Sequence, residues 1–178
     1  MDKKDFNNIS IRGRVAFGII CFEKYVTAKY PNAEFAPVCE LMWSIVSDKD
    51  YIDVSAERYM EIIPEYLYEF DAYEDAGFEF MSAVEFNAMR KLIPPDDDTL
   101  NLIMRRIYDI AMEHAYAAIM PPAKESIDML FEIIQSLETQ GIEVPDIEMV
   151  TSFTFTESGG WGAFISYDNL SKVLGQRQ

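Results

Sequence analysis

Apolar residues recur at helical spacing over most of the chain, and the clearest example begins at Pro37. The apolar positions that follow it lie three or four residues apart, at Val38, Leu41, Met42, Ile45 and Val46. This spacing predicts an amphipathic helix that buries one face. Pro37 suits the first turn of such a helix, and the polar residues 47–50 are expected to end it.

A longer helix is predicted over residues 9–29, and its apolar surface is wide. Apolar neighbours broaden the main stripe until little polar surface is left, at Val15, Phe17, Ile19, Ile20, Cys21, Phe22 and Val26. Such a helix is typical of the buried centre of a bundle. It should stop before Tyr30, because the residue that precedes Pro31 avoids the helical region.

Residues 55–70 also show helical spacing of apolar side chains, but Pro64 lies inside the pattern. Ser55 is a suitable N-cap for a helix here. Pro64 either kinks one continuous helix or opens a second helix at its first position. A break at this point would also divide the acidic residues of the segment into two groups.

Three more helices are predicted in the middle of the chain, and prolines separate them. Three aspartates open the second of these helices, because negative charge is favourable at a helix N-terminus. Gly141 is a natural C-cap for the third. Their predicted ranges are about 78–92, 98–118 and 123–140.

The character of the chain changes after Pro145. Residues 149–156 are rich in β-branched and aromatic side chains, residues 157–160 have turn composition, and residues 161–167 can return as a second strand. A hairpin is stable only when it packs on other elements, so this one should lie on the helices. Asp168 is placed to cap a short helix that runs through residue 174.

The elements together predict an all-α or mainly α fold, a bundle of about six helices with a small β-hairpin near the C-terminus. Residues 1–178 are expected to form a single domain. Within it, residues 1–140 form the helical bundle and residues 145–167 form the hairpin packed on it. A length of 178 residues with 49% hydrophobic content suits one packed domain.

The chain carries a net charge of −16 and has a pI near 4.3, which disfavours nucleic acid and anionic membrane surfaces as partners. No apolar run approaches the ~20 residues that span a bilayer, and the first residues do not resemble a secretory signal. We therefore expect a cytoplasmic protein. Cys21 and Cys39 each lie in an apolar helical pattern and are interpreted as reduced core thiols, with a disulfide as the alternative.

The negative charge is concentrated in one segment. Residues 51–89 hold ten acidic residues and one basic residue, a net charge of −9, whereas residues 1–30 carry +3. Four of the acids recur every fourth residue, and like charges at that spacing destabilise a helix by roughly 0.2–0.5 kcal/mol per pair. These four are Glu57, Glu61, Glu65 and Glu69. The arrangement favours a positively charged partner, and the alternative is a surface that only maintains solubility.

Tyrosines alternate with these acids, and aromatic anchors inside a charged rim are typical of tight protein interfaces. A complementary basic partner would also associate faster. The predicted partner-binding residues are Asp53, Glu57, Tyr59, Glu61, Glu65, Tyr66, Tyr68, Glu69, Asp71, Tyr73, Glu74 and Asp75.

The sequence offers little catalytic or metal-binding chemistry. His114, the one histidine, falls on an apolar helical stripe and is interpreted as a core residue instead of a general base. The acids of the later helices lack the Glu-x-x-His spacing of carboxylate-bridged metal sites, and Arg105 is spaced to pair with Asp109. No catalytic residue, cofactor or metal ligand is assigned, and no enzymatic activity is expected.

The first ninety residues or so resemble the small, acidic, mostly helical immunity proteins of bacterial polymorphic-toxin systems. The resemblance is carried by the run 14–17 (RVAF) leading to Glu23 and Lys24, by Trp43, and by the acidic, tyrosine-rich segment that follows. It implies a cytoplasmic protein that binds and neutralises a cognate toxin, often a nuclease with a basic active-site cleft. It implies no catalytic residues, and it does not extend to residues 145–174.

We therefore expect an immunity protein whose acidic, tyrosine-bearing surface covers the functional site of a toxin. Two alternatives come from other classes of protein. One is a carboxylate-dependent metalloenzyme built in the bundle core, and the other is a structural or interaction module whose acidic surface keeps it soluble.

Overall fold

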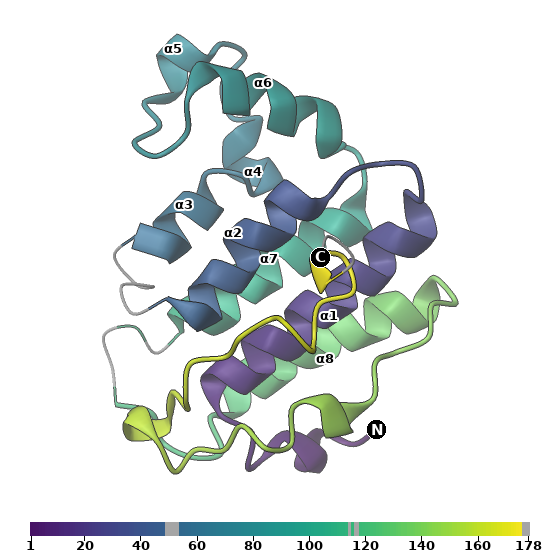
Figure 1. Cartoon of the computed structure of the whole chain (residues 1–178), viewed down its shortest axis with the longest axis vertical. Coiled ribbons are helices and arrows are strands. Elements are labelled where there is room, and N and C mark those ends of the chain that lie inside the picture. Colours follow the sequence, from purple (N-terminus) through teal and green to yellow (C-terminus); the bar gives the residue numbers. More distant parts are fainter. Residues whose placement is uncertain (49–53, 114, 116–117, 176–178) are drawn as a thin grey trace.

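Residues 1–48, 54–113, 115 and 118–175 are described by the computed structural model. They form a bundle of helices (Figure 1), which confirms the mainly helical class. The helices are α1 (Ile11–Lys29), α2 (Ala36–Ser47), α3 (Ala56–Met60), α4 (Pro64–Leu67), α5 (Tyr73–Ala76), α6 (Ala83–Leu92), α7 (Asp98–Met112) and α8 (Lys124–Thr139). Short 3-10 turns are η1 (Lys3–Phe6), η3 (Ile147–Met149) and η4 (Ser158–Gly160).

Helix α1 is the buried centre of the bundle, as its wide apolar surface predicts. It packs against α7 and α8 and, less extensively, against α2. Every residue from Ile11 to Glu23 is buried. Gly18 lets α1 approach α7 closely, because a Cβ at this position would lie 3.1 Å from Cγ1 of Ile107. None of the helices in the described ranges is both long and apolar enough to cross a membrane.

The segment around Pro64 follows the second of the two alternatives, two short helices. Helix α3 stops at Met60, Ile63 adopts an extended conformation (φ −65°, ψ 133°), and Pro64 opens α4 at its first turn. Proline lacks the N–H that a continuous helix would need there, so the chain turns instead. The four regularly spaced acids therefore do not stack along one helix.

The predicted β-hairpin over residues 145–167 is wrong. Across the described residues the sole β pairing is an isolated bridge between Ile9 and Thr154. The N–H groups at the start of α1 explain the difference, because helix termini leave such donors without intrahelical partners. The amide of Ser10 donates to the carbonyl of Phe153 at 2.8 Å, and the amide of Arg12 donates to that of Trp161 at 3.0 Å. The C-terminal segment thus pairs with the beginning of α1 instead of with itself.

Two other helix ends follow their sequence signals. Gly141 (φ +68°) ends α8 with a Schellman motif, in which the amide of Ile142 donates to the carbonyl of Leu137 at 2.9 Å. Asp97 caps α7 by accepting a hydrogen bond from the amide of Leu100.

The predicted short helix after Asp168 does not form, and residues 168–174 make turns. Cys21 and Cys39 are buried and free, as the interpretation of core thiols expects.

Candidate functional site

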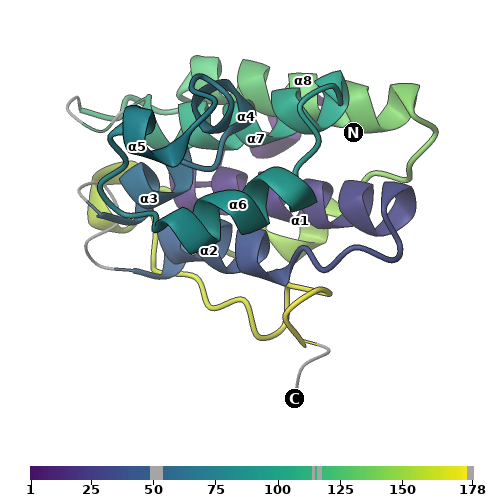
Figure 2. The ribbon, with the colours of Figure 1, turned by 90° about the horizontal axis from the view of Figure 1, so that it is seen from above.

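The predicted acidic segment occupies the side of the molecule that carries α3, α4, α5 and α6, away from α8 (Figure 1; Figure 2 shows it from above). Eight of its carboxylates are exposed. Glu85 belongs to the N-terminal cap of α6, and we call the other seven the acidic surface. The set is Glu57, Glu65, Glu69, Asp71, Glu74, Asp75 and Glu79. Asp53, also predicted to bind a partner, lies outside the described residues.

Most carboxylates of the acidic surface have no positive partner within the described part of the chain. The exception is Glu65, whose carboxylate pairs with Arg105 at 2.5 Å. Three acids of α7 and α8 differ, because Arg106 pairs with both Asp109 and Glu132, and Lys3 pairs with Asp128. The predicted pair between Arg105 and Asp109 is confirmed at 2.9 Å.

Glu61 is the predicted acid that does not reach the surface. Its side chain is buried, and its carboxylate accepts hydrogen bonds from the amides of Glu79 at 2.6 Å and Phe80 at 3.1 Å. It therefore ties the loop before α6 to the end of α3. Sequence spacing placed Glu61 with its neighbours Glu57 and Glu65, whereas the turn before Pro64 directs it inward.

The predicted tyrosines hold the segment together, and this role was missed from the sequence. Tyr59 is fully buried and donates its hydroxyl to the carbonyl of Met104 at 2.7 Å. Tyr68 donates to two backbone carbonyls of the α6 end, and Tyr73 donates to that of Met81. Tyr66 is half-buried beside Arg105. Whether these residues bind a partner stays a prediction, but they are not freely exposed anchors.

A small hollow lies within the acidic surface, between α3, α4 and the loop after α5. Its volume is about 240 Å³. The acidic part of its lining includes Glu57, Glu69 and Glu79, and Phe70 on its wall is 38% exposed. The aromatic part of the lining is completed by Tyr66, Phe78 and Phe80. An apolar floor inside a negative rim is the kind of site that accepts the stem and the charge of a basic side chain together.

Several tyrosines, both within the acidic segment and elsewhere in the chain, have raised pKa values. Burial raises the pKa of Tyr59, Tyr68 and Tyr108. Burial is the largest cause of the raised pKa of Tyr25 and Tyr30, and the hydrogen bond that each hydroxyl donates to Asp97 is the next largest. The pKa of these hydroxyls is higher in the folded state than the value of about 10 in the unfolded state. They therefore stabilise the fold below about pH 10, and this stabilisation is lost as the pH rises through the pKa of the folded state.

We predict that part of the alkaline titration is delayed. The tyrosinate absorbance of Tyr25, Tyr30, Tyr59, Tyr68 and Tyr108 should appear only above about pH 10, in a steep phase that coincides with loss of helical circular dichroism. In urea the ten tyrosines should titrate together. A single native phase near pH 10 with the helices intact would contradict the buried arrangement of these hydroxyls.

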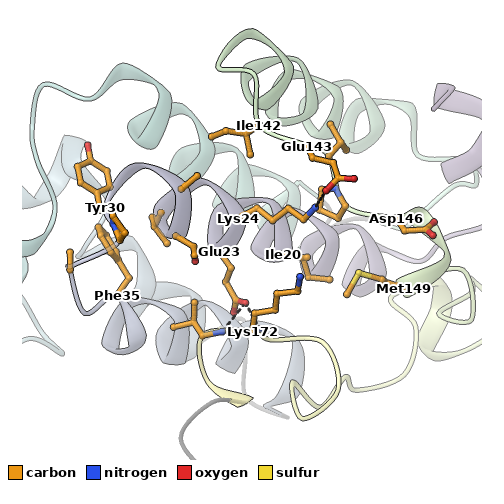
Figure 3. A pocket seen from close by; sticks show the side chains of 18 of the residues that line it. Ile20, Glu23, Lys24, Tyr30, Phe35, Ile142, Glu143, Asp146, Met149 and Lys172 are labelled. Atoms are coloured by element: carbon orange, nitrogen blue, oxygen red, sulfur yellow. Dashed lines mark hydrogen bonds and ion pairs between the residues drawn. The ribbon is translucent and has the colours of Figure 1, made fainter.

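A larger cleft lies elsewhere, and its volume is about 780 Å³ (Figure 3). It runs between the C-terminal half of α1, the loop after it, and residues 142–149 and 172–173. Lys24 and Glu143 form an ion pair at 3.2 Å across it. Its other charged groups include Asp146, which caps η3. Lys24 and Glu143 are engaged with one another and Asp146 accepts from the amide of Glu148, so these three groups favour no particular ligand chemistry.

Glu23, at the wall of this cleft, has a buried carboxylate that accepts hydrogen bonds from α2 and from the C-terminal segment (Figure 3). It accepts hydrogen bonds from Nε1 of Trp43 at 2.8 Å and from the hydroxyl of Ser171 at 2.5 Å. The amides of Lys172 at 2.8 Å and Val173 at 3.3 Å complete the set. Glu23 therefore joins α1, α2 and the C-terminal segment.

Arg14 is a second buried charge, at the opposite end of α1. Its Nη1 donates to the carbonyl of Ala123 at 2.8 Å and to the hydroxyl of Ser126 at 2.6 Å. Its Nη2 donates to the carbonyls of Phe6 at 2.9 Å and Pro122 at 2.7 Å. Burial lowers its pKa to about 10, so the guanidinium is charged at neutral pH. It joins η1 and the beginning of α8 to α1.

The described residues contain no group of three or more His, Cys, Asp or Glu side chains that could hold a metal ion. Of the later-helix acids considered for that role, Asp109, Asp128 and Glu132 are in ion pairs. His114 lies outside the described residues.

Comparison with known proteins returns no match among family models, curated proteins or solved structures. The resemblance to immunity proteins therefore stays a prediction from the sequence pattern. Within this chain the residues of that pattern have structural tasks, because Arg14, Glu23 and Trp43 are all buried and Trp43 donates to Glu23.

Proposed function

We propose that this chain is an immunity protein, a non-enzymatic cytoplasmic inhibitor that binds a basic protein toxin and covers its functional site. One observation carries the proposal. The carboxylates of Glu57, Glu69 and Glu79 surround an aromatic hollow and have no positive partner among the described residues, whereas three acids of α7 and α8, Asp109, Asp128 and Glu132, are neutralised by neighbouring bases.

The contrast favours a binding surface over a coating for solubility. Charge that serves solubility alone can be distributed over the whole molecule and needs no aromatic floor. Here the unpaired acids are adjacent, and Phe70 is exposed among them. A basic partner would neutralise this surface and bury the aromatic floor, so that charge selects the partner and burial slows its dissociation.

Replacing Glu57, Glu69 and Glu79 together with Gln should slow association with the partner about tenfold at low salt and flatten its salt dependence, because steering by charge is lost. Stopped-flow or surface-immobilised kinetics would measure the rate. The matched control replaces the exposed acids Glu125, Glu138 and Glu157 with Gln, which changes the net charge equally. Equal slowing in both variants would show that net charge, and not this surface, guides association.

The partner can be sought directly by affinity capture from the native organism with the tagged chain, washed at low and then at high salt. We expect one protein with a basic domain, retained at low salt and weakened as the salt rises. The control triple variant should retain it, whereas the Glu57, Glu69 and Glu79 variant should lose it. Retention of nothing by the wild-type chain would count against an inhibitor and would favour the solubility alternative.

A further inference from the structure

The hollow of the acidic surface is built by three separate segments of the chain, and each contributes one exposed carboxylate to its lining. Glu57 comes from α3, Glu69 follows α4, and Glu79 lies in the loop between α5 and α6. None of the three carboxylates forms an ion pair or a side-chain hydrogen bond with another described residue. Three carboxylates that remain available to a ligand therefore border one small space.

Aromatic side chains form much of the lining between these carboxylates, at Tyr66, Phe70, Phe78 and Phe80. Phe70 is 38% exposed, so its ring offers apolar area that a ligand would remove from water. The face of an aromatic ring also attracts a cation placed over it. The aromatic lining and the carboxylates thus favour the same kind of occupant, a positively charged group with an apolar stem.

Contacts behind the lining hold it in place. The carboxylate of Glu61 accepts hydrogen bonds from the amides of Glu79 at 2.6 Å and Phe80 at 3.1 Å, and its second oxygen also accepts from Phe80 at 3.2 Å. Both oxygens of Glu61 are thus engaged, so it positions the loop and is not itself a ligand contact. The ring of Phe78 packs on that of Phe86, with centroids 5.7 Å apart. Because the lining is already ordered, binding would lose little free energy to ordering it.

The size of the hollow suits a single side chain. Its volume of about 240 Å³ is below the roughly 300–1,000 Å³ of sites that enclose a drug-sized ligand. Among basic side chains, arginine fits this lining better than lysine. The planar guanidinium stacks on aromatic rings and donates to more than one carboxylate at once, whereas the ammonium of lysine is compact and more strongly hydrated.

We infer that this hollow is a socket for one arginine side chain of the partner protein. The guanidinium lies against the exposed ring of Phe70 and donates to the carboxylates that border the hollow. The inference rests on the proposed function, because it concerns the same surface, and it deepens that function by naming the residue through which the partner is anchored. Arginine seated in a pocket is typical of the few residues that dominate the binding energy of an interface.

The test needs no partner protein. Three capped tripeptides, in which glycines flank arginine, lysine or citrulline, are titrated at low salt into the isotope-labelled full chain and followed by NMR. Citrulline keeps nearly the shape of arginine but has no charge. We expect the arginine peptide to bind with a Kd of about 1 mM and to shift the amide signals of residues 77–80. The lysine peptide should bind about fivefold more weakly, and the citrulline peptide should not saturate the chain.

Two variants of the lining each have a matched control outside the hollow. Phe70→Ala and Glu69→Gln should each weaken binding of the arginine peptide about three- to fivefold. Tyr167→Ala removes another exposed aromatic ring, and Glu74→Gln removes an equal charge from the same acidic surface. Each control should change binding less than about 1.5-fold.

Equal binding of the arginine and citrulline peptides, or equal effects of a lining variant and its control, would overturn the inference. The outcomes also separate the socket from the proposed function. If the chain captures a basic partner but does not bind the arginine peptide, the socket is refuted and the inhibitor stands. If the arginine peptide binds as expected but the capture retains nothing, the socket stands and the inhibitor is contradicted.

Discussion

Replacing Arg14 with Met should reduce the free energy of unfolding by about 2–4 kcal/mol, one of the two largest single-residue effects expected in this chain. The substitution leaves the carbonyls of Phe6, Pro122 and Ala123 without the donors they now have. Hydrogen bonds to a charged group contribute about 1.5–3 kcal/mol each. Removing the desolvation cost of the buried guanidinium, which lowers its pKa to about 10, offsets part of this loss.

Urea unfolding followed by circular dichroism measures the effect, and two further variants separate its causes. Arg14→Lys keeps the charge but cannot spread two nitrogens over four acceptors, so it should also be clearly destabilising. Arg58→Met removes an exposed Arg and should change stability by less than about 0.5 kcal/mol. Wild-type stability in Arg14→Met, or in Arg14→Lys, would contradict the role of the forked hydrogen bonds.

Replacing Glu23 with Ala should cost about 2–4 kcal/mol and release the C-terminal segment from the bundle. The indole N–H of Trp43 and the amide of Lys172 would lose their acceptor in the interior. Glu23→Gln keeps the shape of the side chain but loses the charge and one acceptor oxygen, so about half of that cost is expected. Because the carboxylate joins two helices to the tail, both the stability and the position of the tail should change.

Two readouts distinguish local release from general destabilisation. Trp43 fluorescence should change in native buffer, and limited proteolysis should cleave within residues 166–175 faster than in the wild-type chain. Glu138→Ala, an exposed position at the end of α8, is the matched control and should behave as wild type. Unchanged tail protection in Glu23→Ala would mean that other contacts hold the segment.

The positions of the long helices could be predicted because each has a strong local signal. The apolar spacing of α2, the wide apolar surface of α1 and the Schellman glycine after α8 each act within a few residues of the feature they determine. The β-hairpin could not be judged in this way. Its phenylalanines and threonines suit a strand, but the unpaired amides at the start of α1 compete for the same carbonyls, and that competition depends on tertiary position.

The candidate site was predictable in charge but not in detail. Composition located the acidic segment, because burial of so many unpaired carboxylates would be unfavourable and most had to remain exposed. Tyr59 is buried on α3, and Glu61, which follows the helix directly, is buried as well. The structural roles of Arg14 and Glu23 could not be predicted, since two of their partners, Ala123 and Ser171, lie more than one hundred positions away.

The most direct test of the central claim is rescue of growth by co-expression. Cells would express the basic domain of the captured partner with the wild-type chain, with the Gln variant of Glu57, Glu69 and Glu79, or with the control variant of Glu125, Glu138 and Glu157. We predict that the domain is toxic alone, that the wild-type chain and the control variant restore growth, and that the acidic-surface variant does so poorly. A domain that is harmless alone, or full rescue by the acidic-surface variant, would contradict the account.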